Sequence, residues 1–259
     1  MITRLPVFLA GLILTACAGL PGPAALDIAP GTPAALPTAT TVWFPPSATP
    51  TLRVFPTSVP TIEYMPGVGN VLLSDDFSSP ALWDTAVSDQ ASADISRNRL
   101  TLAVQPGFKM SSLRRDIILV NFYAEVTARP SLCRGSDEYG LLLRAIPAAS
   151  YRFALSCSGT ERLDRAGVNS TVSLQSAVAS GDVPLGAPGE VRIGVWAVGS
   201  ELRFFLNGRY QFSVNDKSYA SGTIGLFART GGDTPVTVTF SDFVVYDVNY
   251  TFPTRTPKP

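Results

Sequence analysis

Apolar and polar residues alternate through most of the chain beyond residue 100. The alternation is clearest in residues 121–129, NFYAEVTAR, and residues 190–198, EVRIGVWAV, where apolar side chains recur at every second position. A period of two indicates a β-strand that buries one face. Further strands are predicted at residues 100–104, 139–146, 151–157, 161–167, 171–178, 222–229 and 236–248.

A hairpin is predicted where two alternating runs meet. Residues 201–214, ELRFFLNGRYQFSV, place Asn207-Gly208 between the runs, and this dipeptide favours a type I′ turn. Many short strands without a convincing helix predict an all-β domain over residues 68–249, built as an antiparallel two-sheet sandwich. No longer repeat recurs, so a propeller or a solenoid is not expected.

The N-terminus resembles a bacterial lipoprotein signal. Arg4 precedes an apolar run at residues 5–16 that is too short to cross a bilayer. The run ends in LTAC at residues 14–17, which matches the lipobox that precedes an acylated cysteine. We therefore expect a signal peptide at residues 1–16, lipid on Cys17, and export to the outer face of a bacterial membrane. An ordinary secretory signal with a chance cysteine remains the alternative.

A linker is predicted between the signal and the sandwich. Residues 17–67 hold half of the chain's 22 prolines and are rich in threonine and alanine. Such a segment lacks the patterned apolar face that offsets the entropy of ordering, so we expect it to be disordered and partly polyproline II. The C-terminal residues 250–259 repeat this composition, and a disordered tail is predicted there.

The cysteine count fits an exported lipoprotein. If lipid occupies Cys17, two of the three cysteines remain, Cys133 and Cys157. In an oxidising compartment these two can form a disulfide. Two separate free thiols are the alternative.

Charge and composition exclude several function classes. Lysine plus arginine balance aspartate plus glutamate at 20 each, so no basic surface for nucleic acid is expected. The chain contains no histidine, which removes histidine-based acid–base catalysis, histidine metal sites and every Ser-His-Asp triad.

Several stretches resemble the concanavalin A-like lectin/glucanase sandwiches. They are LLSDDFSSPALWD from residue 72, EYGLLLRAIPAASYRFALSCSGTERLDR from residue 138, LRFFLNGRYQFSVND from residue 202, SGTIGLFA from residue 221 and TFSDFVVYD from residue 239. The bacterial branch labelled 3-keto-disaccharide hydrolase, or DUF1080-like, is the most similar. The resemblance implies a jelly roll whose first and last strands lie side by side. Phe77 and Trp83 are expected in the core near the first strand.

The resemblance is weak for catalysis. Family 16 glucanases carry Glu-x-Asp-x-x-Glu on one strand, which gathers carboxylates on one face, and no such run occurs here. No catalytic residue and no cofactor are therefore assigned. Asp75, Asp76 and Asp242 could hold a structural calcium if the terminal strands pair, although turn and cap roles are the alternative.

A ligand surface is predicted from the alternation of side chains between the two faces of each strand. If the apolar neighbours are core, Arg144, Arg152, Arg192 and Trp196 face outward and could grip a glycan or cell-wall polysaccharide by stacking and guanidinium hydrogen bonds. A loop that covers Trp196 is the alternative. The favoured function is a surface-anchored, non-catalytic lectin-like module, and the alternatives are a carbohydrate-active hydrolase and a structural envelope protein.

Overall fold

The computed structural model describes residues 63–253, which fold into two antiparallel β-sheets packed face to face. The only helix in this range is the short 3-10 helix η1 (Pro80–Leu82). No helix in the described part of the chain is long and apolar enough to cross a membrane. The all-β sandwich predicted from alternation is confirmed.

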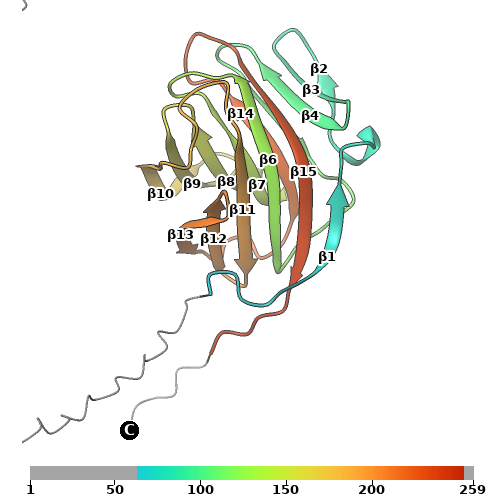
Figure 1. Cartoon of the computed structure of the whole chain (residues 1–259), viewed down its shortest axis with the longest axis vertical. Coiled ribbons are helices and arrows are strands. Elements are labelled where there is room, and N and C mark those ends of the chain that lie inside the picture. Colours follow the sequence, from blue (N-terminus) through green and yellow to red (C-terminus); the bar gives the residue numbers. More distant parts are fainter. Residues whose placement is uncertain (1–62, 254–259) are drawn as a thin grey trace, which may run out of the picture. The chain divides into compact units, whose positions relative to one another are not determined.

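The larger sheet has nine strands (Figure 1). Its order is β13 (Arg209–Asn215), β12 (Glu201–Leu206), β11 (Val191–Val198), β6 (Phe122–Leu132), β15 (Val236–Val248), β4 (Arg99–Val104), β3 (Ala91–Ser96) and β2 (Ala86–Val87). The ninth strand, β1 (Val68–Asp75), pairs with β15.

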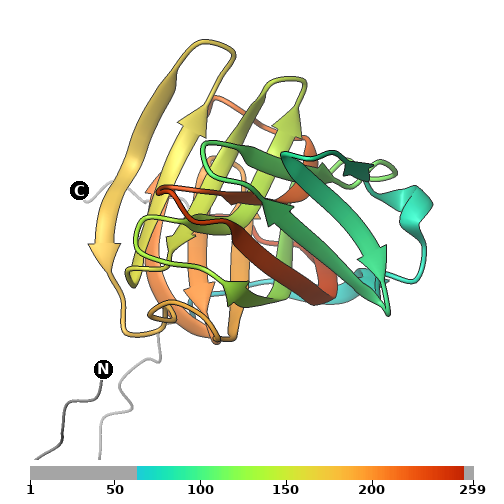
Figure 2. The ribbon, with the colours of Figure 1, turned by 90° about the horizontal axis from the view of Figure 1, so that it is seen from above.

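The smaller sheet has six strands, and it carries the pocket described below. Its order is β10 (Thr171–Ala179), β9 (Thr160–Ala166), β8 (Ala149–Ser156), β7 (Glu138–Ile146), β14 (Thr223–Arg229) and β5 (Lys109–Leu113). Figure 2 shows β9 and β10, in yellow, on the opposite side of the molecule from the green β3 and β4.

The core lies between the sheets and is built by strand alternation. In the six-stranded sheet, Leu226, Leu141, Phe153 and Leu163 pair in one row across four strands, and all four are fully buried. Burying one such side chain contributes roughly 1.5–3 kcal/mol, so each row is a large stabilising term. Along each strand, the residues directly before and after these core residues point to the outer face of the sheet.

The terminal strands close the domain as the family resemblance implied. Asp75 of β1 pairs with Phe243 of β15, and Figure 1 shows the two strands side by side. Trp83 packs edge-on against Phe243 with ring centroids 5.5 Å apart, and Phe77 lies 5.2 Å from Trp83. Both residues are buried, which confirms their predicted place in the core.

Two local predictions are also confirmed. Asn207 and Gly208 join β12 to β13 with φ of +53° and +76°, as a type I′ turn requires. Cys133 and Cys157 form a disulfide with their Cα atoms 5.8 Å apart. Cys133 follows β6 and Cys157 follows β8, so the bond joins the nine-stranded sheet to the six-stranded sheet.

Residues beyond the terminal strands also pack on the domain. Tyr64 stacks on Tyr210 with ring centroids 4.3 Å apart, and the Pro66 carbonyl accepts a hydrogen bond from Trp196. Tyr250 and Phe252 pack edge-on against the same tryptophan. We call residues 64–66 and 250–252 the terminal clasp. These residues were assigned to the linker and the tail from composition alone.

Candidate functional site

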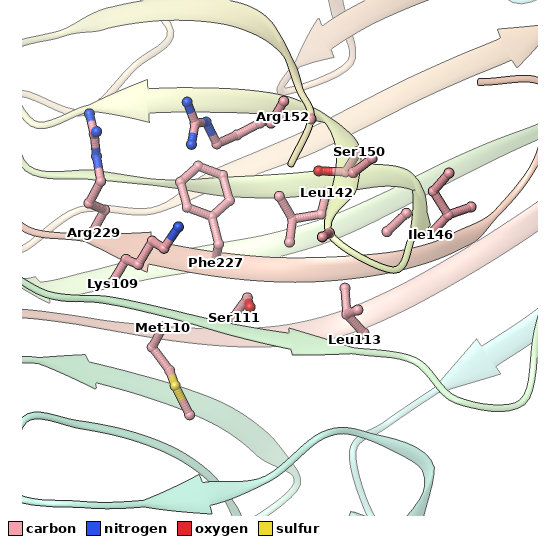
Figure 3. A pocket seen from close by; sticks show the side chains of 15 residues that line it. Lys109, Met110, Ser111, Leu113, Leu142, Ile146, Ser150, Arg152, Phe227 and Arg229 are labelled. Atoms are coloured by element: carbon pink, nitrogen blue, oxygen red, sulfur yellow. The ribbon is translucent and has the colours of Figure 1, made fainter. Parts of the chain in front are cut away.

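A pocket of about 260 Å³ opens on the outer face of the six-stranded sheet (Figure 3). Strands β5, β14, β7 and β8 supply most of its walls. Leu142, Arg152 and Phe227 reach it because each lies between two core-facing neighbours and so points away from the core. Side-chain alternation in four adjacent strands therefore builds the site.

One end of the pocket is cationic. Lys109 of β5 pairs with Arg229 of β14 in the sheet, so their side chains leave the same face. Figure 3 shows the Lys109 amino group and the guanidinium groups of Arg152 and Arg229 around the ring of Phe227. The ring is only 5% exposed, so it forms an apolar floor rather than an open stacking platform.

The other end of the pocket is apolar. Its lining there comes mainly from Leu113, Leu142, Ile146, Ala148 and Ala149. Next to Phe227 on the neighbouring strand lies Gly140, whose φ is +154°. A Cβ there would meet the Phe153 carbonyl oxygen at 2.1 Å and the Phe227 ring at 3.4 Å, so glycine is needed for this packing.

An ion network lies beside the cationic end. Arg162 of β9 donates from Nε and Nη2 to the two oxygens of Glu138, both at 2.9 Å. Arg229 Nη2 lies 2.7 Å from Glu138 Oε2, and Arg152 Nη2 donates to Asp164 Oδ2 at 2.9 Å. Arg162 also pairs with Asp164 and so links the two carboxylates.

The network neutralises two nearly buried carboxylates. The side chains of Glu138 and Asp164 are 9% and 2% exposed. The hydrogen bonds from Arg162 to Glu138 are the main reason why the pKa of Arg162 lies above its ordinary value. Because both Glu138 oxygens accept hydrogen bonds from arginines, the arrangement fits a structural network better than an acid–base pair.

Arg152 is the one predicted ligand residue that lines this pocket. Arg144 does not, because β7 has a register irregularity between Leu143 and Ile146 and Arg144 itself has φ of +45°. Its guanidinium is buried and donates to the carbonyl oxygens of Gly199, Tyr219 and Val120 at 2.7–3.0 Å. Burial lowers the pKa of Arg144, and its buried position differs from the outward orientation that alternation predicted.

Arg192 and Trp196 lie in the other sheet, on β11. Both face away from the core as parity predicted, but Arg192 is exposed whereas the terminal clasp leaves Trp196 0% exposed. The Trp196 Nε1 donates to Pro66 O at 3.0 Å, and the Arg203 guanidinium lies 4.4 Å from the ring centroid. The four predicted residues therefore share no common surface, and Trp196 is not an open platform.

The three predicted calcium ligands are not brought together. Asp75 is buried, pairs with Arg114, and accepts hydrogen bonds from Trp83 Nε1 and from the Phe77 amide, both at 2.7 Å. Asp76 accepts a hydrogen bond from the Ser78 amide, which helps to lower its pKa, and Asp242 accepts one from Ser241. Residues 63–253 contain no group of three or more acidic, cysteine or histidine side chains placed to hold a metal. The predicted acylation site, Cys17, lies outside the described residues.

The sequence prediction missed Lys109, Glu138, Arg162, Asp164 and Arg229. The alternation in TERLDRA, residues 160–166, carried the relevant signal for β9, because Arg162 and Asp164 flank the core residue Leu163. Arg229 carried a similar signal at the end of TIGLFAR, because it follows the core residues Leu226 and Ala228 in alternation, whereas Lys109 gave none. Lys109 and Arg229 meet only through the pairing of β5 with β14, which no local pattern reveals.

Neither a protein-family model nor a curated protein sequence matches the chain. Solved structures do match it at the level of the fold. They include the carbohydrate binding module CBM66 from Bacillus subtilis, at 14% identity and a TM-score of 0.50, covering 73% of this chain and 100% of the module.

Two further structures are similar to the same extent. A Bacillus licheniformis β-glucanase has 11% identity and a TM-score of 0.52, with 70% of this chain and 99% of the enzyme covered. A Bacillus subtilis protein of unknown function with a galectin-like fold has 14% identity and a TM-score of 0.53, with 71% and 99% covered. At such identities the likeness shows the fold: the described domain is a concanavalin A-like or galectin-like jelly-roll sandwich.

Proposed function

We propose that the protein is a non-catalytic, lectin-like module that binds glycans in the pocket on the six-stranded sheet. The observation that carries the proposal is that one pocket combines an apolar end with a second end lined by the guanidinium groups of Arg152 and Arg229. Apolar side chains such as Leu142 can cover the C–H faces of a sugar, and guanidinium groups such as that of Arg152 can donate to its oxygens. The fold neighbours include a carbohydrate-binding module, which supports the proposal by analogy.

Binding without hydrolysis is favoured by the state of the carboxylates. A glycosidase needs one carboxyl group that donates a proton and a second that acts as base or nucleophile. Beside this pocket Arg162 and Arg229 occupy both oxygens of Glu138, and Arg152 and Arg162 share an oxygen of Asp164. These carboxylates are therefore engaged as partners of arginine rather than presented to a substrate.

We further propose that Cys17 carries lipid and tethers the domain to the outer face of a bacterial membrane. The lipobox-like LTAC at residues 14–17 supports this part of the proposal. Because one acyl chain anchors only weakly, stable attachment needs the several chains that lipoprotein maturation adds.

A glycan array with the purified full chain tests the function. We expect binding to at least one glycan, and Arg152→Gln should weaken it by roughly tenfold because a hydrogen bond from a charged donor is lost. Arg192→Gln is the matched control, since Arg192 is an exposed arginine on the opposite sheet. Absence of binding to any glycan, or equal losses in both variants, would contradict the proposal.

A further inference from the structure

We infer that the saccharide bound in this pocket carries a negative charge, and that Lys109 and Arg229 hold its acidic group. The inference rests on the proposed function and adds the class of ligand. It begins from an excess of positive charge. Four cationic side chains, Lys109, Arg152, Arg162 and Arg229, line the pocket or its ion network, and only two carboxylates, Glu138 and Asp164, face them.

This excess is local, because the whole chain carries 20 positive and 20 negative side chains. Within the described residues, Lys109 takes part in no ion pair, and its side chain is exposed, so its three ammonium hydrogens are available to a ligand. A neutral sugar would leave the surplus charge uncompensated, whereas an acidic group would neutralise it. The charge balance of the pocket therefore favours an anion.

The arginines also have donors to spare. Arg229 and Arg152 each engage one carboxylate through Nη2, and a guanidinium has five N–H donors. The Nε atoms of both residues are buried and have no hydrogen-bond partner in residues 63–253. A ligand does not contact these buried atoms directly, but it can reach the remaining donors of the two side chains, which are 17% and 39% exposed. Arg162 differs, since its Nε, Nη1 and Nη2 all donate to carboxylates.

The position of Lys109 and Arg229 suits a group on a longer glycan. A second hollow, of about 420 Å³, is lined by Gly107, Phe108 and Thr230 and shares these two cations with the main pocket. Lys109 and Arg229 thus lie where the two hollows meet. A glycan that extends from one hollow into the other would carry its acidic group past both side chains.

The planar, forked geometry of arginine fits a carboxylate, such as that of a hexuronic acid, and it also fits a sulfate or phosphate ester. The shared chemistry is an anionic oxygen group on a sugar. A comparison of uronate glycans with their carboxyl-reduced forms isolates that group, because reduction removes the charge and keeps the sugar stereochemistry. Sulfated glycans form the second arm and identify the acid.

The test is a titration of the full chain with these glycans at two salt concentrations. We expect an acidic glycan to bind at least roughly tenfold more tightly than its neutral counterpart, and this preference should fall as salt is raised. Lys109→Gln and Arg229→Gln should each abolish most of the preference, while Arg192→Gln retains it. Lys109 is exposed, so its variant stays informative even if Arg229→Gln fails to fold.

The outcomes separate the two proposals. Equal affinity for the acidic and the neutral glycan overturns the anionic inference and leaves glycan binding intact. An unchanged preference in Lys109→Gln overturns the assignment of the acidic group to Lys109. Failure to bind any glycan overturns the proposed function itself. A stronger preference for sulfated than for carboxylated glycans supports the anionic inference and assigns the acidic group as sulfate.

Discussion

Trp196 shows how a side chain can leave the core and still be buried. It lies on the outer face of the nine-stranded sheet, where Tyr123, Phe205 and Val248 form a second small apolar cluster around it. The terminal clasp covers this cluster, and the hydrogen bond to Pro66 satisfies the indole N–H. The energetic role of Trp196 is therefore that of a core residue.

We expect Trp196→Ala to lower the free energy of unfolding by roughly 3–5 kcal/mol, as large-to-small changes in cores do. Urea unfolding monitored by far-UV circular dichroism measures the change. Arg192→Ala, four residues away on the same strand, is the control and should shift stability by less than about 0.5 kcal/mol. An unaltered unfolding midpoint in Trp196→Ala would show that the clasp does not cover the ring in solution.

Glu161 is a second residue whose burial has a measurable consequence. It is 4% exposed, its Oε2 has no hydrogen-bond partner in the described part of the chain, and burial raises its pKa from 4.5 to about 7. The folded protein therefore holds this proton to higher pH than the unfolded chain does. The stability associated with it is fully present below pH 4.5 and is lost as pH rises to about 7.

Glu161→Gln should remove this pH dependence. As pH rises from 4 to 8, the wild type should lose up to roughly 3 kcal/mol of unfolding free energy relative to the variant. Denaturant unfolding of both proteins at each pH provides the measurement, and titrations common to both cancel in the difference. A difference that stays constant with pH would mean that Glu161 ionises normally.

At the scale of elements, the disulfide is a covalent cross-link between the sheets in addition to the backbone. It joins the end of β6 to the end of β8, and its cysteines are 24 positions apart. Closing a loop of this length in the unfolded chain is worth roughly 3–4 kcal/mol in the chain-entropy model. Its loss should therefore destabilise the packing of one sheet on the other.

We expect the Cys133→Ser, Cys157→Ser double variant to have a free energy of unfolding about 3 kcal/mol lower than the wild type, and so to unfold at a lower denaturant concentration. Reductant should have the same effect on the wild type. Reductant should leave the double variant unchanged, which serves as the internal control. Mass mapping without reduction that finds two free thiols in exported protein would refute the pairing.

The elements that the sequence predicted are mostly those in which apolar residues recur at every second position. β15 was predicted at residues 236–248, and the strand observed is Val236–Val248. β5, with the sequence KMSSL, has too few apolar residues to stand out, and β1 has only one buried residue. Strands with few apolar residues, such as β5, therefore escape the pattern, whereas the exposed edge strand β10 was predicted from TVSLQSAV although none of its residues is buried.

The site was predictable only in part for the same kind of reason. Arg152 was found because β8 alternates regularly, whereas the bulge in β7 inverted the expected direction of Arg144. Parity also cannot tell which of the two sheets a strand joins, so Arg192 and Trp196 were grouped with residues of the other sheet. The covering of Trp196 by residues 64–66 and 250–252 depends on contacts far apart in sequence.

At the scale of the whole molecule, the terminal clasp and the pocket lie on opposite outer faces of the described sandwich. The clasp packs on the nine-stranded sheet, and the pocket opens on the six-stranded sheet. Val68 pairs with Val248, so the terminal strands reach the same end of the domain. Both ends of the described chain therefore pack on the sheet that does not carry the pocket.

We expect Cys17→Ser to release the protein from the membrane, because it removes the proposed acylation site. Labelled palmitate should be incorporated into the wild type and not into the variant, and the variant should move to the soluble fraction. Glycan affinity should stay the same, since the variant changes none of the residues that line the pocket. Palmitate incorporation that persists in the variant would refute acylation at this residue.

The disulfide also determines how the domain would carry mechanical load. If the N-terminal side is held while the pocket grips a ligand, tension enters through β1, whose hydrogen bonds to β15 run perpendicular to the strand. That tension must then pass from the nine-stranded sheet to the six-stranded sheet, which carries the pocket. Apart from the backbone connections, Cys133–Cys157 is the one covalent bond in the described part of the chain that joins these sheets. With the Cys133–Cys157 disulfide formed, a larger force would be needed to separate the two sheets, and with the disulfide reduced they would separate at a lower force.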